Sequence, residues 1–389
     1  MKSRPKIAIG GSVVALIAAA IAVTTLVPAA LGAQPVPSGS PLSGKIAYGF
    51  GDAFTINPDG SQLDQIGVPG STVCTAWSLD TTKLLCNVFS DNGPQPATAN
   101  PNGSDFTYLN QNLPVDLFCL YYSPQTGSRL LCHSEGIANP ADSGLYTIRS
   151  SDGRGLVRVS TTLPGGFDDA YGYSPDGSRI LYTQFDANGV GSLLSVKTDG
   201  SDPIRLSPPG LSLIDLNFYD EIGASWSPDG SQVTFAAHQL SSNAFTTALY
   251  VVNANGSGLH QIASTSVGAI SARWSPDGKL IAFTGCPNNC GNFFAPWHGG
   301  NPQVGPGGNP QVWVVHPDGS GLRQITTATS GYTAVAPIWS PDSTKLLFNR
   351  QNGTGAISLW TVNSDGSGLS KLTDTEGLTG YAWGSAPPG

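Results

Sequence analysis

The sequence has 389 residues, 39% of them hydrophobic, and its 49 glycines and 30 prolines recur along the whole chain. This hydrophobic content argues against intrinsic disorder, and the glycine and proline content indicates many turns. The formal net charge of −8 repels phosphate backbones, so we do not expect nucleic acid as a partner.

The first predicted element is an export signal. Lys2, Arg4 and Lys6 precede an apolar run from Ile7 to Val27, and small residues follow at Ala30-Leu31-Gly32. This order is typical of a secretory signal, so we assign residues 1–33 to a signal peptide. The apolar run is long, and the alternative is an uncleaved N-terminal anchor.

Residues 34–43 are rich in proline, glycine and serine and are interpreted as a linker. Without the three basic residues of the signal, the chain keeps 15 basic and 26 acidic residues, a net charge of −11. The mature chain is therefore expected outside the cytoplasm, secreted, periplasmic or anchored to the outer face of the membrane, with no other membrane segment.

From residue 44 onward the sequence repeats, and internal repeats decide how every residue inside them is interpreted. An aromatic residue followed by serine, or by glycine in the last copy, recurs every 44 to 65 residues, at Trp77, Tyr122, Tyr173, Trp226, Trp274, Trp339 and Trp383. The first six are followed by a turn and an apolar strand, such as RILY or KLLF. A second strand such as ALYVV, a glycine turn and a last strand such as GLHQIA complete the copy. Each copy predicts four antiparallel strands, A to D.

The first copy lacks strand A, and the end of the chain, Gly380–Trp383, supplies it. This circular completion closes a ring and leaves no exposed sheet edge. We therefore predict an all-β fold, a seven-bladed β-propeller of four-stranded antiparallel blades over residues 44–389, with the first blade completed by the C-terminal strand.

The Ser-Pro-Asp-Gly motif between strands A and B has the composition of a turn. Proline presets the second turn position, aspartate suits the third, and glycine supplies the left-handed residue that rejoins the strand. SPDS at Ser340 and SLDT at Ser78 lack the glycine, and this tolerance suits a turn better than a catalytic acid. The alternative role for these aspartates is calcium binding.

The repeated sequence pattern WSPDGxxIAF…LYVVNxDGSGLxxLT resembles the TolB-type, WD40-like propeller repeat. That repeat occurs in the C-terminal domain of periplasmic TolB proteins and in the propellers of prolyl-oligopeptidase-like enzymes. The resemblance covers nearly all of the mature chain and implies the fold, not an activity. TolB proteins carry an α/β domain before the propeller and usually six blades, whereas this chain has a short linker there and seven predicted blades.

The six cysteines favour disulfides over metal ligation in an exported chain. The first cysteine of blades two and three lies three residues before the repeated aromatic, and the second takes the last position of the KLLC or RLLC strand. Equivalent residues on adjacent antiparallel strands come close enough for a bond. We predict three pairs: Cys74 with Cys86, Cys119 with Cys132, and Cys286 with Cys290.

Signatures of catalysis are missing from the sequence. It contains no Gly-x-Ser-x-Gly, no His-Glu-x-x-His and no phosphate-binding glycine loop, so we name no catalytic residue. The alternative is a polysaccharide lyase or hydrolase, because oligogalacturonate lyases have a propeller of similar repeats and use a metal at its mouth. That alternative requires His133, His238 and His298 to converge with carboxylates.

The B–C and D–A connections lie at one end of the ring and carry most of the variation in length, which makes that end the expected working face. The longest insertion, Gly285–Gln311, holds the ligand-binding candidates Phe293, Phe294, Trp297 and His298. Aromatic residues beside amides suit protein hot spots and sugar stacking. The alternative is that these rings pack onto their own blade.

Two acidic pairs are candidates for a divalent cation: Asp168 with Asp169, and Asp220 with Glu221, near the starts of neighbouring inner strands. The alternative is a solvated acidic rim, and no other cofactor is expected. The leading hypothesis is a monomeric, exported, non-enzymatic binding module for a protein or an envelope polysaccharide.

Overall fold

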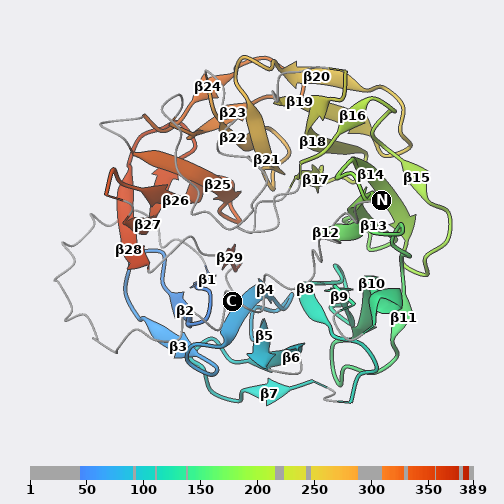
Figure 1. The fold of residues 1–389 in the computed structure, drawn as a ribbon. Helices are drawn as coiled ribbons and strands as arrows, with labels where there is room; N and C mark the ends of the chain where they lie inside the picture. The colour runs from blue at the N-terminus through green and yellow to red at the C-terminus, as the bar shows by residue number, and fades with distance from the viewer. Residues whose placement is uncertain are drawn as a thin grey trace, which may run out of the picture. The chain divides into compact units, whose positions relative to one another are not determined.

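The computed structural model describes residues 44–90, 93–109, 112–136, 139–214, 223–241, 247–287, 309–327, 332–354, 356–375 and 380–384. All of them belong to the compact unit Leu42–Gly389. They form seven antiparallel sheets around a ring, together with one short 3₁₀ helix, η1 (Pro140–Asp142) (Figure 1). Among the described residues, no helix is long and apolar enough to cross a membrane.

Each blade has its first strand at the ring axis and its last strand at the rim (Figure 1). Blade 1 consists of β29 (Tyr381–Trp383), β1 (Ile46–Tyr48), β2 (Ala53–Ile56) and β3 (Asp64–Ile66). Blade 2 consists of β4 (Thr72–Trp77), β5 (Leu84–Ser90), β6 (Gly93–Ala99) and β7 (Thr107–Tyr108). Blade 3 consists of β8 (Phe118–Tyr122), β9 (Arg129–Ser134), β10 (Gly144–Arg149) and β11 (Val157–Arg158). Blade 4 consists of β12 (Phe167–Tyr173), β13 (Arg179–Phe185), β14 (Gly191–Lys197) and β15 (Ile204–Arg205).

Blade 5 has a divided inner strand, because β16 (Leu211–Ser212) and β17 (Ala224–Trp226) both pair with the same second strand. The rest of blade 5 is β18 (Gln232–Gln239), β19 (Thr247–Asn253) and β20 (His260–Ala263). Blade 6 consists of β21 (Ala269–Trp274), β22 (Ile281–Gly285), β23 (Gln311–Val315) and β24 (Arg323–Gln324). Blade 7 consists of β25 (Thr333–Trp339), β26 (Lys345–Gln351), β27 (Ile357–Asn363) and β28 (Ser370–Thr375).

The ring closes where the sequence predicts it. β29 pairs antiparallel with β1, placing Trp383 opposite Ile46 and Tyr381 opposite Tyr48. The amide of Gly384 also donates to the carbonyl oxygen of Lys45 over 3.0 Å. These contacts confirm the seven-bladed propeller and the completion of its first blade by the C-terminal strand.

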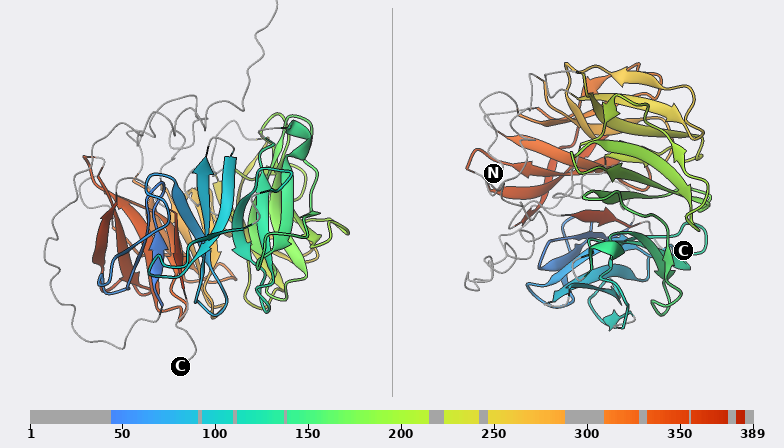
Figure 2. Two further views of the ribbon diagram at one scale, coloured as in Figure 1. Left: turned by 90° about the horizontal axis from the view of Figure 1, so that it is seen from below. Right: turned by 45° about the vertical axis from the view of Figure 1, so that its right-hand side comes forward.

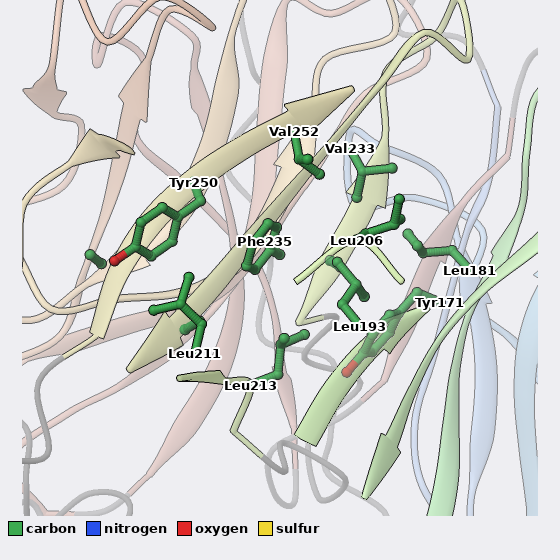
Figure 3. Close-up of a cluster of buried hydrophobic side chains, with 13 residues drawn as sticks. Tyr171, Leu181, Leu193, Leu206, Leu211, Leu213, Val233, Phe235, Tyr250 and Val252 are labelled. Carbon is green, nitrogen blue, oxygen red and sulfur yellow. The ribbon is translucent and has the colours of Figure 1, made fainter. Parts of the chain in front are cut away.

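Apolar side chains on both faces of each sheet hold neighbouring blades together. In the largest cluster, Tyr171, Leu181 and Leu193 of blade 4 face Phe235 and Tyr250 of blade 5 (Figure 3). Every repeated aromatic residue packs against a cluster of this kind or belongs to one. The fixed register of these aromatics therefore reflects packing between wedge-shaped blades.

The Asp residues of the A–B turns are structural, as predicted. Asp176 Oδ1 accepts from the Ser174 hydroxyl over 2.6 Å and from the Ser178 amide over 3.1 Å. The pKa of Asp176 is lowered, chiefly by the Ser174 hydrogen bond. Where the motif lacks glycine, Ser343 and Thr81 still adopt the left-handed conformation, with φ of 63° and 56°.

Two disulfides join the first two strands of blades 2 and 3, Cys74 to Cys86 and Cys119 to Cys132, the pairs that the repeat register predicts. Cys286 is also disulfide-bonded, and Cys290, its predicted partner, lies outside the described residues. Disulfides fit an extracytoplasmic protein, because cytosolic thiols are kept reduced.

Candidate functional site

The strands run between two ends of the ring (Figure 2). We call the end that carries the A–B and C–D turns the turn end, and the end that carries the B–C and D–A connections the loop end. β22 ends and β23 begins at the loop end. Phe293, Phe294, Trp297 and His298 come between these two strands in the sequence, and they lie outside the described residues.

The proposed cation site is only half described. Asp168 is 8% exposed and accepts hydrogen bonds from the Ser160 hydroxyl and the Gln184 amide. Burial raises the pKa of Asp168, against the lowering effect of these two bonds. Asp168 and Asp169 are consecutive in β12 and pair with consecutive residues of β13, so they point to opposite faces of the sheet. At most one of them can face blade 5.

Asp220 and Glu221, the other two candidates, lie outside the described residues. Across the described ranges, no group of three or more His, Cys, Asp or Glu side chains is arranged to hold a metal ion. The cation site therefore stays a prediction.

Of the histidines that an enzyme would bring together, the two described ones lie on different blades. His133 lies on β9 of blade 3, where its ring stacks on Phe118 with centroids 5.3 Å apart. His238 lies on β18 of blade 5, opposite Ser212. Burial lowers the pKa of His238, and its hydrogen bond to the Ser212 backbone acts in the opposite direction. His298 falls outside the described part of the chain.

An aromatic row crosses the loop end of blades 1 to 3. Phe50 follows β1, Phe89 lies near the end of β5, and Phe118 begins β8. The ring centroids of Phe50 and Phe89 are 5.7 Å apart, those of Phe89 and Phe118 are 5.8 Å apart, and His133 continues the row. Phe50 is 57% exposed, and the other three rings are partly exposed. The row is a strip of ring surface that an extended ligand can contact.

A buried hydrogen-bond pair fixes the base of the aromatic row. The Asn87 side chain, on β5, donates to the Cys119 carbonyl oxygen over 2.8 Å and accepts from the Cys119 amide over 2.7 Å. Asn87 is fully buried, and Cys119 is also held by its disulfide. These bonds lock blade 2 against blade 3 beside Phe89 and Phe118, so the row is positioned before any ligand arrives.

Burial lowers the pKa of His133 to about 4, from an ordinary value of 6.5. The ring is therefore neutral at neutral pH. Between pH 6.5 and 4 the unfolded chain binds a proton at this site that the folded chain does not bind. The free energy of unfolding consequently falls as the pH is lowered through this window.

The substitution His133→Phe keeps a stacking ring and removes the titrating group. When the pH is lowered from 6.5 to 4, we expect the free energy of unfolding to fall less in this variant than in the wild-type protein. The difference is about 2 kcal/mol after allowance for partial exposure of the ring. Urea unfolding at a series of pH values measures it. Equal losses in both proteins would assign the acid sensitivity to other groups.

Blade 7, the other neighbour of blade 1, carries a second aromatic group at the loop end. The Arg350 guanidinium lies 4.3 Å from the ring centroid of Tyr332 and 4.6 Å from that of Trp360. Burial lowers the pKa of Arg350, which still leaves a cation between two aromatic faces. Aromatic side chains are thus present at the loop end on both sides of the closure.

A cavity of about 440 Å³ lies on the ring axis at the turn end. Its wall combines ends of inner strands with residues of two A–B turns, Ser78 and Pro276 among them. Four of the repeated aromatics also line it: Trp77, Trp274, Trp339 and Trp383. The sequence predicts binding at the loop end, and this cavity at the turn end was not predicted.

No family model and no curated protein matches the sequence. Similarity is found among solved structures. TolB from Acinetobacter baumannii has a TM-score of 0.50 and 16% identity, covering 88% of this chain and 67% of that one. An oligogalacturonate lyase in complex with manganese has a TM-score of 0.54 and 12% identity, covering 85% and 86%.

A puromycin-hydrolysing peptidase of Mycobacterium tuberculosis has a TM-score of 0.57 and 11% identity, and the match covers 83% of this chain and 50% of the peptidase. At such identities the similarity is one of fold. The chain has a TolB-like propeller fold, and proteins with this fold have different activities.

Proposed function

We propose that the protein is an exported, non-enzymatic binding module whose loop end holds a protein or a polysaccharide of the cell envelope. The aromatic row of Phe50, Phe89, Phe118 and His133 carries this proposal. Its rings span three blades, and one of them is more than half exposed. Extended ligands gain affinity from stacking on such rings when the scaffold holds them in place.

The route of the chain supports the choice of the loop end. Lys45 lies directly before β1 at the turn end, and the Gly384 amide donates to its carbonyl oxygen there. The two described ends of blade 1 therefore lie at the turn end. The B–C and D–A connections remain at the opposite end for contact with a ligand. The insertion with Phe293, Phe294, Trp297 and His298 joins β22 to β23 at this end, and we propose that it adds contacts to the same ligand.

Export is the second part of the proposal. Two intrablade disulfides and the signal-like N-terminal sequence support it. Whether the chain is released, periplasmic or anchored by its N-terminus is tested by the N-terminal sequence of the protein recovered from the native cell. A mature N-terminus near residue 34 identifies cleavage.

The binding function is tested with arrays of envelope polysaccharides and immobilised peptides, using the purified protein. We expect retention on one array, weakened at least about tenfold by Phe50→Ala or Phe89→Ala. Leu63→Ala is the matched control, because Leu63 is 56% exposed on the same blade but lies at the turn end. Equal retention of all the variants, or retention on neither array, contradicts the proposal.

A polysaccharide lyase or hydrolase acting at the loop end is the alternative function. The likeness of fold to an oligogalacturonate lyase that binds manganese favours it. Incubation of the polysaccharides with the protein, with and without manganese, tests it by chain-length analysis. Shortening of the polymer supports catalysis, and an unchanged length distribution supports binding alone.

A further inference from the structure

The axial cavity at the turn end differs from the aromatic row in position and in chemistry. It is built from the inner strands, which approach the axis one per blade (Figure 1). The residue just before each repeated aromatic occupies one register in all seven blades. These residues are Ala76, Tyr121, Gly172, Ser225, Arg273, Ile338 and Ala382. Five of the seven line the cavity: Ala76, Tyr121, Arg273, Ile338 and Ala382.

Arg273 departs from the rest of this register. The other six positions hold neutral residues, and four of these are Ala, Gly or Ser. Packing at the axis therefore does not require a long or charged side chain. Among the described residues that line the cavity, Arg273 is also the one charged residue. The Arg273 guanidinium is therefore the one cationic group among these lining residues that can attract an anion.

The backbone around Arg273 is held in place. β21 has a bulge between Ile270 and Arg273, with Ser271 in the left-handed conformation at φ of 55°. A bulge redirects the side chains that follow it. The carbonyl oxygen of Arg273 accepts a hydrogen bond from the indole nitrogen of Trp339 over 3.1 Å. The next blade thereby fixes the position from which the guanidinium extends.

The walls determine which kind of anion fits. A volume of about 440 Å³ is suited to a small molecule. Four tryptophans contribute to the lining, and three of them, Trp77, Trp274 and Trp383, are partly exposed; indole rings offer flat apolar surface. A guanidinium binds a carboxylate through two parallel hydrogen bonds. The combination of rings and one guanidinium suits a molecule with a planar ring and a carboxylate.

We propose that the axial cavity is a second binding site, specific for a small carboxylate with a planar ring, with Arg273 holding the carboxylate. This site is separate from the proposed loop-end site and does not depend on it. The proposal predicts that affinity depends on both the charge and the ring of the ligand.

Calorimetry of the purified protein with benzoate, benzamide and inorganic phosphate, each alone, tests the site. We expect one benzoate site, with benzamide and phosphate each bound at least about tenfold more weakly. Benzamide keeps the ring without the charge, and phosphate keeps negative charge without the ring. No benzoate binding up to about 10 mM overturns the proposal, as does equal or tighter binding of benzamide or phosphate.

Arg273→Gln is expected to weaken benzoate binding at least about tenfold, and Arg273→Lys to weaken it less. Arg323→Gln is the control, because Arg323 lies exposed on the outer strand of the same blade. An unchanged affinity in Arg273→Gln overturns the proposal. If that variant fails to fold, the affinities of the wild-type protein for benzoate and benzamide test the proposed site instead. Loss of benzoate binding leaves retention on the polymer arrays unaffected, so the two proposed sites are judged separately.

Discussion

Removal of Tyr381–Gly389 is expected to abolish cooperative unfolding of the propeller. The deletion takes away β29, which pairs with β1, and leaves blade 1 without its inner strand. It also removes the Ala382 carbonyl oxygen that accepts from the Trp77 indole over 3.1 Å. Loss of a buried Tyr and a Trp alone costs more than about 6 kcal/mol, comparable to the whole stability of many domains.

A shorter deletion provides the control for the closure of the ring. Removing residues 385–389 keeps β29 and the bond from Gly384 to Lys45, so we expect an unchanged melting curve. Calorimetry on both truncated proteins and the full chain makes the comparison. An intact cooperative transition without Tyr381–Gly389 would refute closure by the C-terminal strand.

Replacement of the disulfides is the second change with a large expected effect. Cys74–Cys86 and Cys119–Cys132 close segments with sequence separations of 12 and 13 residues. Removal of a bond across such a loop costs about 3 kcal/mol. We expect Cys74→Ala/Cys86→Ala to lower stability by about that amount, measured by urea unfolding. Loss of both bonds is expected to leave the ring close to unfolded.

The other blades offer a specific rescue. Where blades 2 and 3 have paired cysteines, blade 4 places Ala170 opposite Tyr182. Blades 5, 6 and 7 have Phe235, Phe283 and Phe348 at the equivalent position, all fully buried. We therefore expect Cys74→Ala/Cys86→Phe to recover part of the loss by filling the space with a ring. Recovery of free thiols at these cysteines from the unreduced native protein would contradict the pairing itself.

The fold could be predicted because its determinants recur in the sequence. One aromatic register, one turn motif and one pair of apolar strands are repeated. Each copy supports the assignment of strands and turns made in the others. The disulfides followed from the same register, since Cys74 and Cys86 face each other in blade 2 as Cys119 and Cys132 do in blade 3 and Ala170 and Tyr182 do in blade 4. The divided inner strand of blade 5 was not predicted. The division into β16 and β17 occurs in one of the seven described blades, so the other copies of the repeat do not indicate it.

The aromatic row could not be predicted, because its members share no position in the repeat. Phe50 follows a second strand, Phe89 is the next-to-last residue of one, and Phe118 starts a first strand. They meet only because neighbouring blades are placed side by side in the ring. Arg273 had a signal in the sequence, since it is the one charged residue in the position before the repeated aromatics. The signal became informative once the structure showed that this register faces the cavity.

Hydrogen exchange of the purified protein, with and without the polymer it retains, tests the central claim of binding at the loop end most directly. We predict slower exchange with the polymer in residues 49–52, 87–90 and 116–119, which contain or flank Phe50, Phe89 and Phe118. The A–B turns, such as residues 78–82, are predicted to exchange at unchanged rates. Protection confined to those turns, with none at the aromatic row, would contradict binding at the loop end.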